Sequence, residues 1–289
     1  MTEEQARKYP FWAWLRGLFQ KVSADDCQGL AAEVAFNMIQ SLIPATFFLI
    51  SLFGLLGQTS VFYALSVDFI DELAPAHTGS LLLHLLDATI RGSTTGLTLA
   101  GMMITLWSAS GSGGVIVKGL RRAYGIPEKG FPFWYTPMVS IVLVLLLGLM
   151  LVVAIYLIMF GDALISWLHG RFHLPFSAVT LLRISRWLVL GCGITAITTL
   201  TYALILRPKT GGFRWRVSLP GAVFFLIAWV SVSELFSLYI NHLHQFNPVY
   251  GALGALIILV TWLYYSALIF FVGAEITARR AGSADKIGF

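Results

Sequence analysis

The stretch that decides the fold is Glu33–Leu56, EVAFNMIQSLIPATFFLISLFGLL. It is long enough to cross a bilayer, because about 20 mostly apolar residues form a sufficiently long helix. Polar residues nevertheless recur in it at intervals of three and four, which places them on one face of a helix. Because polar groups are costly in lipid, this face is expected to turn toward other helices or toward water. The polar face consists of Glu33, Asn37, Gln40, Ser41 and Pro44.

This polar face has two interpretations. Its side chains can hold neighbouring helices together by hydrogen bonds, or they can line the path of an ion or solute. Pro44 removes a backbone donor and so favours a kink at this point. The choice depends on whether a water-filled cavity touches both Glu234 of the fifth span and the Asn37–Gln40 face.

The composition places the chain in a membrane. Of its 289 residues, 57% are hydrophobic and only 11% are charged, with a mean hydropathy of +0.80. A soluble domain of this length carries about 25% charged residues. The net charge of +5 favours contact with anionic lipid headgroups over nucleic acid. With Cys27 and Cys192 as its two cysteines, the chain predicts no disulfide framework, metal site or cofactor.

The apolar runs predict an all-α, polytopic fold with six transmembrane helices of 20 to 24 residues. Residues 1–30 form a cytoplasmic N-terminal segment, residues 31–277 the transmembrane domain, and residues 278–289 a cytoplasmic tail. The predicted spans are Val34–Leu56, Leu97–Val117, Pro137–Phe160, Trp187–Leu206, Leu219–Ile240 and Gly251–Gly273.

The Lys and Arg residues predict the orientation. Of the 19, 15 fall in the two termini and in the loops after the second and fourth spans. Because loops rich in Lys and Arg stay in the cytoplasm, both termini are predicted to be cytoplasmic.

Residues 9–22 predict an amphipathic helix at the membrane surface. Arg16, Gln20 and Lys21 lie opposite its apolar face. Two placements fit this pattern: the helix lies on an anionic leaflet, or it packs against the cytoplasmic side of its own protein. The apolar face consists of Phe11, Trp14, Leu15, Leu18, Phe19 and Val22.

The loop between the first two spans, residues 57–96, contains two amphipathic segments and predicts short external helices. Two sets of residues have spacings that resemble metal sites. A solvated helix face explains the first set better, and the second lacks a third ligand for zinc. The sets are His84, Asp87 and Arg91, and His169 and His173.

Hydroxyl side chains recur on single faces of the second and fourth spans. In the second span they precede Gly113 and Gly114, and small residues of this kind favour close helix packing. In the fourth span they either bond to their own helix carbonyls or face a shared interior. These residues are Thr105, Ser108 and Ser112, and then Thr195, Thr198, Thr199 and Tyr202.

Glu234 is the most informative single residue, because it lies deep inside the predicted fifth span. An ionisable group at that depth is a candidate for proton or cation handling. The alternative is a carboxyl group that holds two helices together. Ser231, Ser237 and Asn241 continue the same face.

Glu275 lies at the inner end of the sixth span, at the depth expected for Glu33. The two carboxylates are candidates for flanking one inner vestibule. The alternative for Glu275 is an ion pair with Arg279 at the membrane surface.

Four segments carry a family resemblance: AAEVAFNMIQSLIP (31–44), WSASGSGGVIVKGLRRAYGIPE (107–128), LPGAVFFLIAWVSVSELFSLYI (219–240) and YGALGALIILVTWLYYSALIFFVGAEI (250–276). Together they resemble the YihY/BrkB family of bacterial inner-membrane proteins, formerly mislabelled as ribonuclease BN. The resemblance implies six helices with cytoplasmic termini, and a link to serum resistance and envelope phenotypes. Ion exchange has been suggested for some members. Arg121 and Thr277 depart from the family pattern, which often has Asn at both positions.

The predicted function is that of a transporter or exchanger of an ion, small solute or lipid. The alternative is a non-transporting envelope or lipid-interacting scaffold. The spans hold no nucleophile–base pair or metal motif, so an enzyme, including a ribonuclease, is not predicted. Membrane lipids, the transported species and a second copy of the chain are the expected partners. The predicted pathway residues are Glu33, Asn37, Gln40, Ser41, Pro44, Ser108, Ser112, Thr198, Tyr202, Ser231, Glu234, Asn241 and Glu275.

Overall fold

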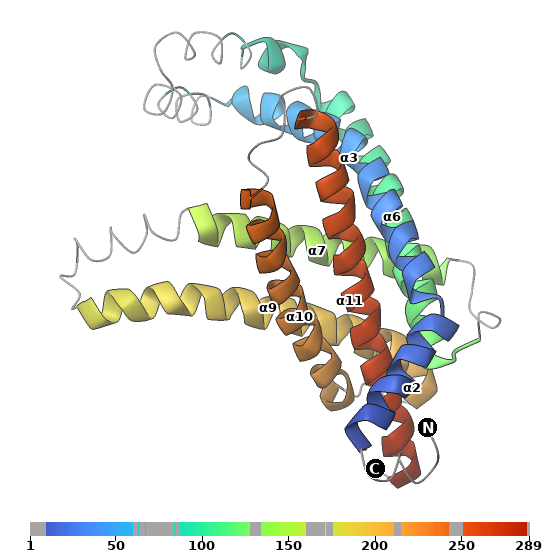
Figure 1. The fold of residues 1–289 in the computed structure, drawn as a ribbon. Coiled ribbons are helices and arrows are strands. Elements are labelled where there is room, and N and C mark those ends of the chain that lie inside the picture. Colours follow the sequence, from blue (N-terminus) through green and yellow to red (C-terminus); the bar gives the residue numbers. More distant parts are fainter. Residues whose placement is uncertain are drawn as a thin grey trace. The chain divides into compact units, whose positions relative to one another are not determined.

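The described part of the chain is helical and contains no strand, which confirms the all-α prediction. The computed structural model describes residues 10–59, 63, 67, 84, 87–127, 134–159, 171, 176–210, 215–242 and 251–287. The helices are α2 (Pro10–Ala24), α3 (Cys27–Gly57), α6 (Thr95–Tyr124), α7 (Tyr135–Met159), α9 (Phe176–Thr210), α10 (Trp215–His242) and α11 (Gly251–Ile287) (Figure 1).

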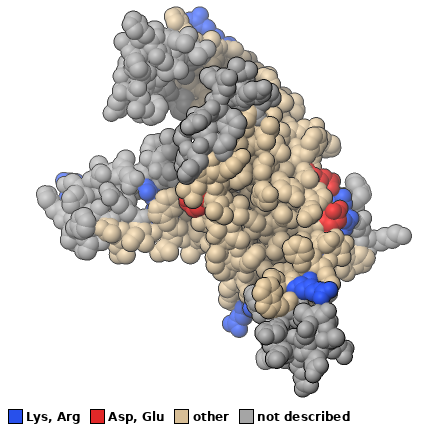
Figure 2. Space-filling view, in the orientation of Figure 1, with Lys and Arg blue, Asp and Glu red and all other residues tan. Residues whose placement is uncertain are grey.

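Five described helices are long and apolar enough to cross a bilayer, which supports a multi-pass membrane protein. They belong to α3, α6, α9, α10 and α11. The apolar stretch described in α7, Tyr135–Leu146, is shorter, so the sixth span stays a prediction. On the face drawn in Figure 2, charged side chains are few and surrounded by uncharged surface.

Several helices run past the predicted spans. α3 begins at Cys27 rather than Val34, and α11 continues to Ile287 rather than ending at Gly273. The reason is that hydropathy detects only the segment that suits lipid, whereas backbone hydrogen bonding continues the helix into polar sequence.

The chain forms two compact units. Unit 1 consists of residues 1–35 and 112–289, and unit 2 consists of residues 36–111. The boundary passes through α3 and α6, so each of these helices contributes one segment to each unit.

The crossing of α10 and α11 is a tightly packed part of unit 1. A Cβ atom added at Gly273 would lie 2.8 Å from the carbonyl oxygen of Gly221, so the two backbones approach closely. Farther along, the indole of Trp229 donates to Ser266 at 3.0 Å, and the indole of Trp262 donates to Ser233 at 3.1 Å. These reciprocal bonds fix the antiparallel register of the two helices.

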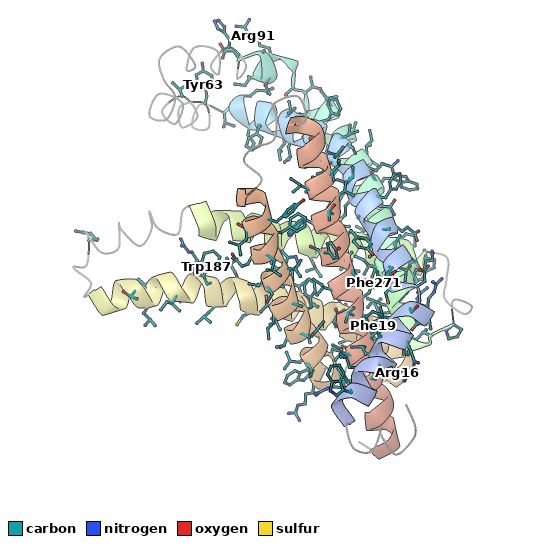
Figure 3. All side chains as sticks on the ribbon, viewed as in Figure 1. Arg16, Phe19, Tyr63, Arg91, Trp187 and Phe271 are labelled. Atoms are coloured by element: carbon teal, nitrogen blue, oxygen red, sulfur yellow. The ribbon has the colours of Figure 1, made fainter. Side chains whose placement is uncertain are left out.

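α6 also packs closely within unit 1, as predicted from its small residues. A Cβ atom added at Gly113 would lie 2.8 Å from the Cα atom of Ser140 on α7. A Cβ atom at Gly119 would collide with the ring of Phe271, which is labelled on α11 in Figure 3. Glycine is therefore required at these two contacts.

α2 packs on α11 with one face only. Leu18 is buried and the Arg279 guanidinium donates to the carbonyl oxygen of Trp14 at 2.9 Å, whereas Trp12 and Phe19 are 61% and 74% exposed. The predicted apolar face is thus divided between the protein and its surroundings. The contacts with α11 agree with the placement against the protein itself, and the placement on an anionic leaflet stays a prediction.

Unit 2 contains an antiparallel pair formed by α3 and α6. The hydroxyls of Ser51 and Thr98 are hydrogen-bonded at 2.7 Å, and a Cβ atom at Gly101 would lie 3.2 Å from the Cα atom of Phe48. α3 continues as a helix through Pro44. The predicted external helices lie largely outside the described residues, although residues 87–92 are helical.

Candidate functional site

Unit 2 contains a groove of about 990 Å³ between α3 and α6. Asn37, Gln40 and Pro44 reach it from α3, and Ser108 reaches it from α6. These are four of the predicted pathway residues, and they come from two spans. The polar face read from the sequence therefore lines a shared groove together with a polar group of the next span.

The groove has a polar region at each end and an apolar middle. Asn37, Gln40 and Ser108 lie toward one end, and Ser51 and Ser93 lie toward the other. Asn37 and Ser51 are about 20 Å apart along α3, given the rise per residue of a helix. Between them the lining includes Ile43, Phe47, Leu97, Ile104 and Trp107.

The amides of Asn37 and Gln40 make no hydrogen bond to any described residue. Asn37 is half-buried and Gln40 is exposed. Because an unbonded amide is costly in an apolar environment, these two groups require water or a ligand as partner. The hydrogen-bonded packing seam, the first alternative for this face, has no support from these two side chains.

Two other residues of the predicted face do not line the groove. The Ser41 hydroxyl donates to the carbonyl oxygen of Met38 at 2.8 Å, within its own helix. Glu33 is paired with Lys118 at 3.2 Å, and both side chains are about half exposed. Ser41 therefore provides a control residue on the same helix.

The predicted residues of α9 and α10 are mostly structural in their contacts. Tyr202 is fully buried and its hydroxyl donates to the carbonyl oxygen of Phe270, joining α9 to α11. Thr198 of α9 is buried as well, and the exposed Ser231 of α10 donates to the carbonyl oxygen of Ile227. Ser112 of α6 is buried, and its hydroxyl has no hydrogen-bond partner among the described residues. The side chain of Asn241 lies outside the described residues.

Glu234 is exposed on α10 and makes no hydrogen bond or ion pair to a described residue. A carboxyl group that fastens two helices together, the alternative to function, is therefore not observed. Glu234 belongs to unit 1 and the groove to unit 2. That the two face one interior stays a prediction.

A second polar cluster lies in unit 1, around Glu275. This side chain is fully buried, so it does not reach the surface as an ion pair with Arg279 would require. The Lys21 ammonium is 3.3 Å from its Oε2 atom, 2.8 Å from Oδ2 of Asp25 and 3.1 Å from the carbonyl oxygen of Ala123. Glu275 is therefore paired with α2 rather than with the next turn of α11.

The turn between α2 and α3 positions this cluster. Asp26 has a φ of 54° and its carboxylate accepts a hydrogen bond from the backbone N–H of Gly29 at 3.2 Å, which caps the start of α3. Asp25 is thereby held beside Lys21, one helical turn away.

The Lys21 ammonium is charged at neutral pH. Burial lowers the pKa of Lys21, but the hydrogen bond to Asp25 and the charges of Glu275 and Asp25 raise the pKa above its ordinary value of 10.5. Sequence reasoning did not single out Lys21 and Asp25 as partners of Glu275. The spacing of four residues could have indicated the pair of Lys21 with Asp25. No local spacing could have indicated Glu275, because Glu275 lies at the other end of the chain.

The described residues contain no group of three or more His, Cys, Asp or Glu side chains that could hold a metal ion. His84 is described and exposed, whereas His169 and His173 lie outside the described residues.

The family model of the virulence factor BrkB matches residues 18–286. This chain belongs to the BrkB family. The resemblance drawn from the four sequence segments is thereby confirmed, and the polar groove and the Glu275 cluster are features of a BrkB family protein.

Curated relatives extend the comparison. The chain is 30% identical over 272 residues to the ribonuclease-like protein YfkH of Bacillus subtilis, covering 92% of this chain and 94% of the relative. It is 26% identical over 270 residues to a UPF0761 membrane protein of Alkalilimnicola ehrlichii, covering 89% of this chain and 56% of the relative. A UPF0761 membrane protein of Verminephrobacter eiseniae is 25% identical over 282 residues. This BrkB family chain thus spans little more than half of some relatives. No solved structure matches.

The two departures from the family pattern are buried and lie outside the groove. Arg121 is 7% exposed with its guanidinium 5.3 Å from the ring centre of Tyr135, and the Thr277 hydroxyl donates to the carbonyl oxygen of Gly273 at 3.1 Å. Both residues therefore belong to the packing of unit 1 in this BrkB family protein.

Proposed function

We propose that this BrkB family protein is a transporter or exchanger that moves an ion or small solute across the bacterial inner membrane. The observation that carries the proposal is the groove into which Asn37, Gln40 and Ser108 project from two spans. Both termini are cytoplasmic in this proposal, following the distribution of Lys and Arg.

The chemistry of the groove favours a small polar or cationic species. Amide oxygens and hydroxyls bind cations and polar solutes without carrying a charge, so that release remains easy. The middle of the groove is apolar, so polar contacts with the moving species are limited to the two ends. Glu234, which has no partner among the described residues, is the group proposed to attract a cation.

Flux measurements on the purified protein in proteoliposomes test this function. Protons, Na⁺ and K⁺ are followed with fluorescent indicators, and a fluorescent phospholipid serves as a lipid probe. We expect wild-type protein to move at least one of these species. We expect the double substitution Asn37→Leu, Gln40→Leu to slow that flux about tenfold or more, because two hydrogen bonds to the moving species are lost.

Ser41→Ala is the matched control, because Ser41 lies on the same helix but bonds to its own backbone. It should retain wild-type flux. Wild-type protein that moves none of the four species down any imposed gradient would contradict the proposal.

The second candidate function is a non-transporting envelope or lipid-interacting scaffold. The exposed Trp12 and Phe19 of α2 favour it, because aromatic residues on an amphipathic helix bind the lipid interface. Under this alternative, Glu234→Gln leaves the envelope phenotype intact, whereas charge reversal at Arg214 and Arg216 abolishes it. Neither candidate function is enzymatic.

A further inference from the structure

We propose that the groove of unit 2 takes up a single-chain amphiphile, that is, an unbranched apolar chain with an uncharged head that forms hydrogen bonds. This substrate class rests on the transport function proposed above and narrows the moving species to a small organic solute. The head is assigned to the end of the groove at Asn37 and Gln40, and the chain to the apolar middle.

The lining of the groove suits an apolar chain better than a bare ion. The described residues that line it include no acidic, basic or histidine side chain. Its polar ends are about 20 Å apart along α3, and Ile43, Phe47 and Ile104 line the stretch between them. A charge in apolar surroundings is costly unless it is paired, whereas an apolar chain is stabilised there by its removal from water.

The groove is also larger than a single ion requires. Its volume of about 990 Å³ is at the upper end of the range of about 300–1,000 Å³ for pockets that hold organic ligands, and a water molecule takes about 30 Å³. α3 and α6 run side by side here and approach closely where Gly101 meets Phe48 (Figure 1). One leaflet of a bilayer has a hydrocarbon layer of about 15 Å, so an acyl chain matches the length of the apolar middle.

The two polar ends differ in their hydrogen bonding. At one end the hydroxyls of Ser51 and Thr98 bond to each other at 2.7 Å, and the Ser93 hydroxyl donates to the carbonyl oxygen four residues earlier at 2.8 Å. At the other end the amides of Asn37 and Gln40 have no described partner. An amide both donates and accepts hydrogen bonds, so the matching head carries hydroxyl or amide groups rather than a charge.

The space for such a ligand is open in unit 2. Phe47 of α3 and Trp107 of α6 line the apolar middle and are 68% and 84% exposed, so a bound chain would cover them. Gly111 also lines the groove, and a Cβ atom there would lie 3.6 Å from the amide carbon of Asn37. The absence of a side chain at Gly111 leaves room for a head beside the Asn37 amide.

The test uses the full-length protein in phospholipid nanodiscs and a monoacylglycerol with a photoreactive diazirine in its acyl chain. The glycerol head offers hydroxyls and no charge. We expect crosslinks in peptides that contain residues 43–47 and 104–107. An excess of unlabelled monoacylglycerol should reduce these crosslinks about fivefold or more, because a binding site saturates by mass action.

Two variants change the two parts of the site separately. Asn37→Leu, Gln40→Leu should lower the affinity for the probe about tenfold, because two hydrogen bonds to the head are lost. Ala100→Trp fills the apolar middle, which Ala100 lines, and should lower the crosslinking by a similar factor. Met103→Trp is the matched control and should match wild type, because Met103 is exposed on the same helix but does not line the groove.

A photoreactive phosphatidylcholine distinguishes a binding site from simple contact with the bilayer, because this two-chain lipid labels any surface that faces lipid. Equal crosslinking of the groove by both probes would overturn the proposal, and so would monoacylglycerol crosslinks that the competitor does not reduce. Flux of an ion without saturable crosslinking would overturn the substrate class and leave the transport function standing. Saturable crosslinking without flux of any species would support the binding site and overturn the transport function.

Discussion

The Lys21 ammonium lies 3.3 Å from Oε2 of Glu275, so that a helix near the N-terminus is joined to the last helix of the chain. The carboxylate is fully buried and the lysine is 38% exposed. Removing one partner of such a pair leaves an uncompensated buried charge, which is far more costly than losing a surface pair. This contact therefore makes the position of α2 sensitive to the protonation of Lys21.

The first prediction concerns alkaline pH. Because the pKa of Lys21 is raised in the folded protein, its stabilising effect is fully present below the ordinary value of 10.5 and is lost as pH rises through the raised pKa. The unfolding midpoint of wild-type protein should fall in that alkaline range. Lys21→Met, measured by the same circular dichroism melts, should lack this step; an identical alkaline decline in both proteins would contradict the assignment.

The second prediction concerns the Glu33–Lys118 pair, which is about half exposed on both sides. Exposed pairs contribute about 0–1 kcal/mol. Glu33→Gln should therefore leave the free energy of unfolding unchanged within about 0.5 kcal/mol. Glu275→Ala should destabilise by about 1–3 kcal/mol, because it removes a fully buried partner while the partly exposed Lys21 keeps Asp25. Comparable effects of the two substitutions in denaturant titrations would show that burial does not distinguish the two carboxylates.

The third prediction concerns the crossing of α10 and α11. Gly273→Ala places a methyl group 2.8 Å from the Gly221 carbonyl oxygen and should force the helices apart, at a cost of about 1–3 kcal/mol. Gly254→Ala is the matched control on the same helix, because a Cβ atom there meets nothing within 4 Å. Gly254→Ala should be neutral or slightly stabilising in thermal unfolding. A Gly273→Ala protein as stable as the control would refute the close approach.

The fourth prediction concerns the paired indoles of the same crossing. Ser266→Ala removes the acceptor of Trp229 at 3.0 Å, and Ser233→Ala removes the acceptor of Trp262 at 3.1 Å. Hydrogen bonds between membrane helices contribute about 0.6 kcal/mol on average, so each single variant should lose about that amount. The double variant should lose roughly the sum, and Trp fluorescence should shift in each single variant. No change in either measurement would exclude these bonds.

The sequence was sufficient to predict the helical fold and a few of the residues that line the groove. Periodic polar residues from Glu33 to Pro44 marked a face, and three of the five residues line the groove. Periodicity succeeds here because neighbours on one helix face are fixed by local geometry. The small residues around Gly113 likewise predicted the close helix packing that is observed there.

Periodicity could not predict the partner of Glu275. Local spacing suggested Arg279 on the same helix, but the carboxylate is buried against Lys21 of α2. A contact between residues so distant in sequence depends on how the helices pack, and no local pattern contains that information. The exposed position of Glu234, with no described partner, was equally hidden from the sequence.

The most direct test of the central claim, that the polar face of α3 is wet, is the labelling of single cysteines in the membrane. Gln40→Cys and Leu42→Cys are compared in a Cys27→Ala, Cys192→Ser background, because both positions are exposed but only Gln40 lines the groove. A charged, water-soluble thiol reagent should modify the cysteine at position 40 rapidly and the one at position 42 slowly. Equally slow modification at both positions would contradict the claim.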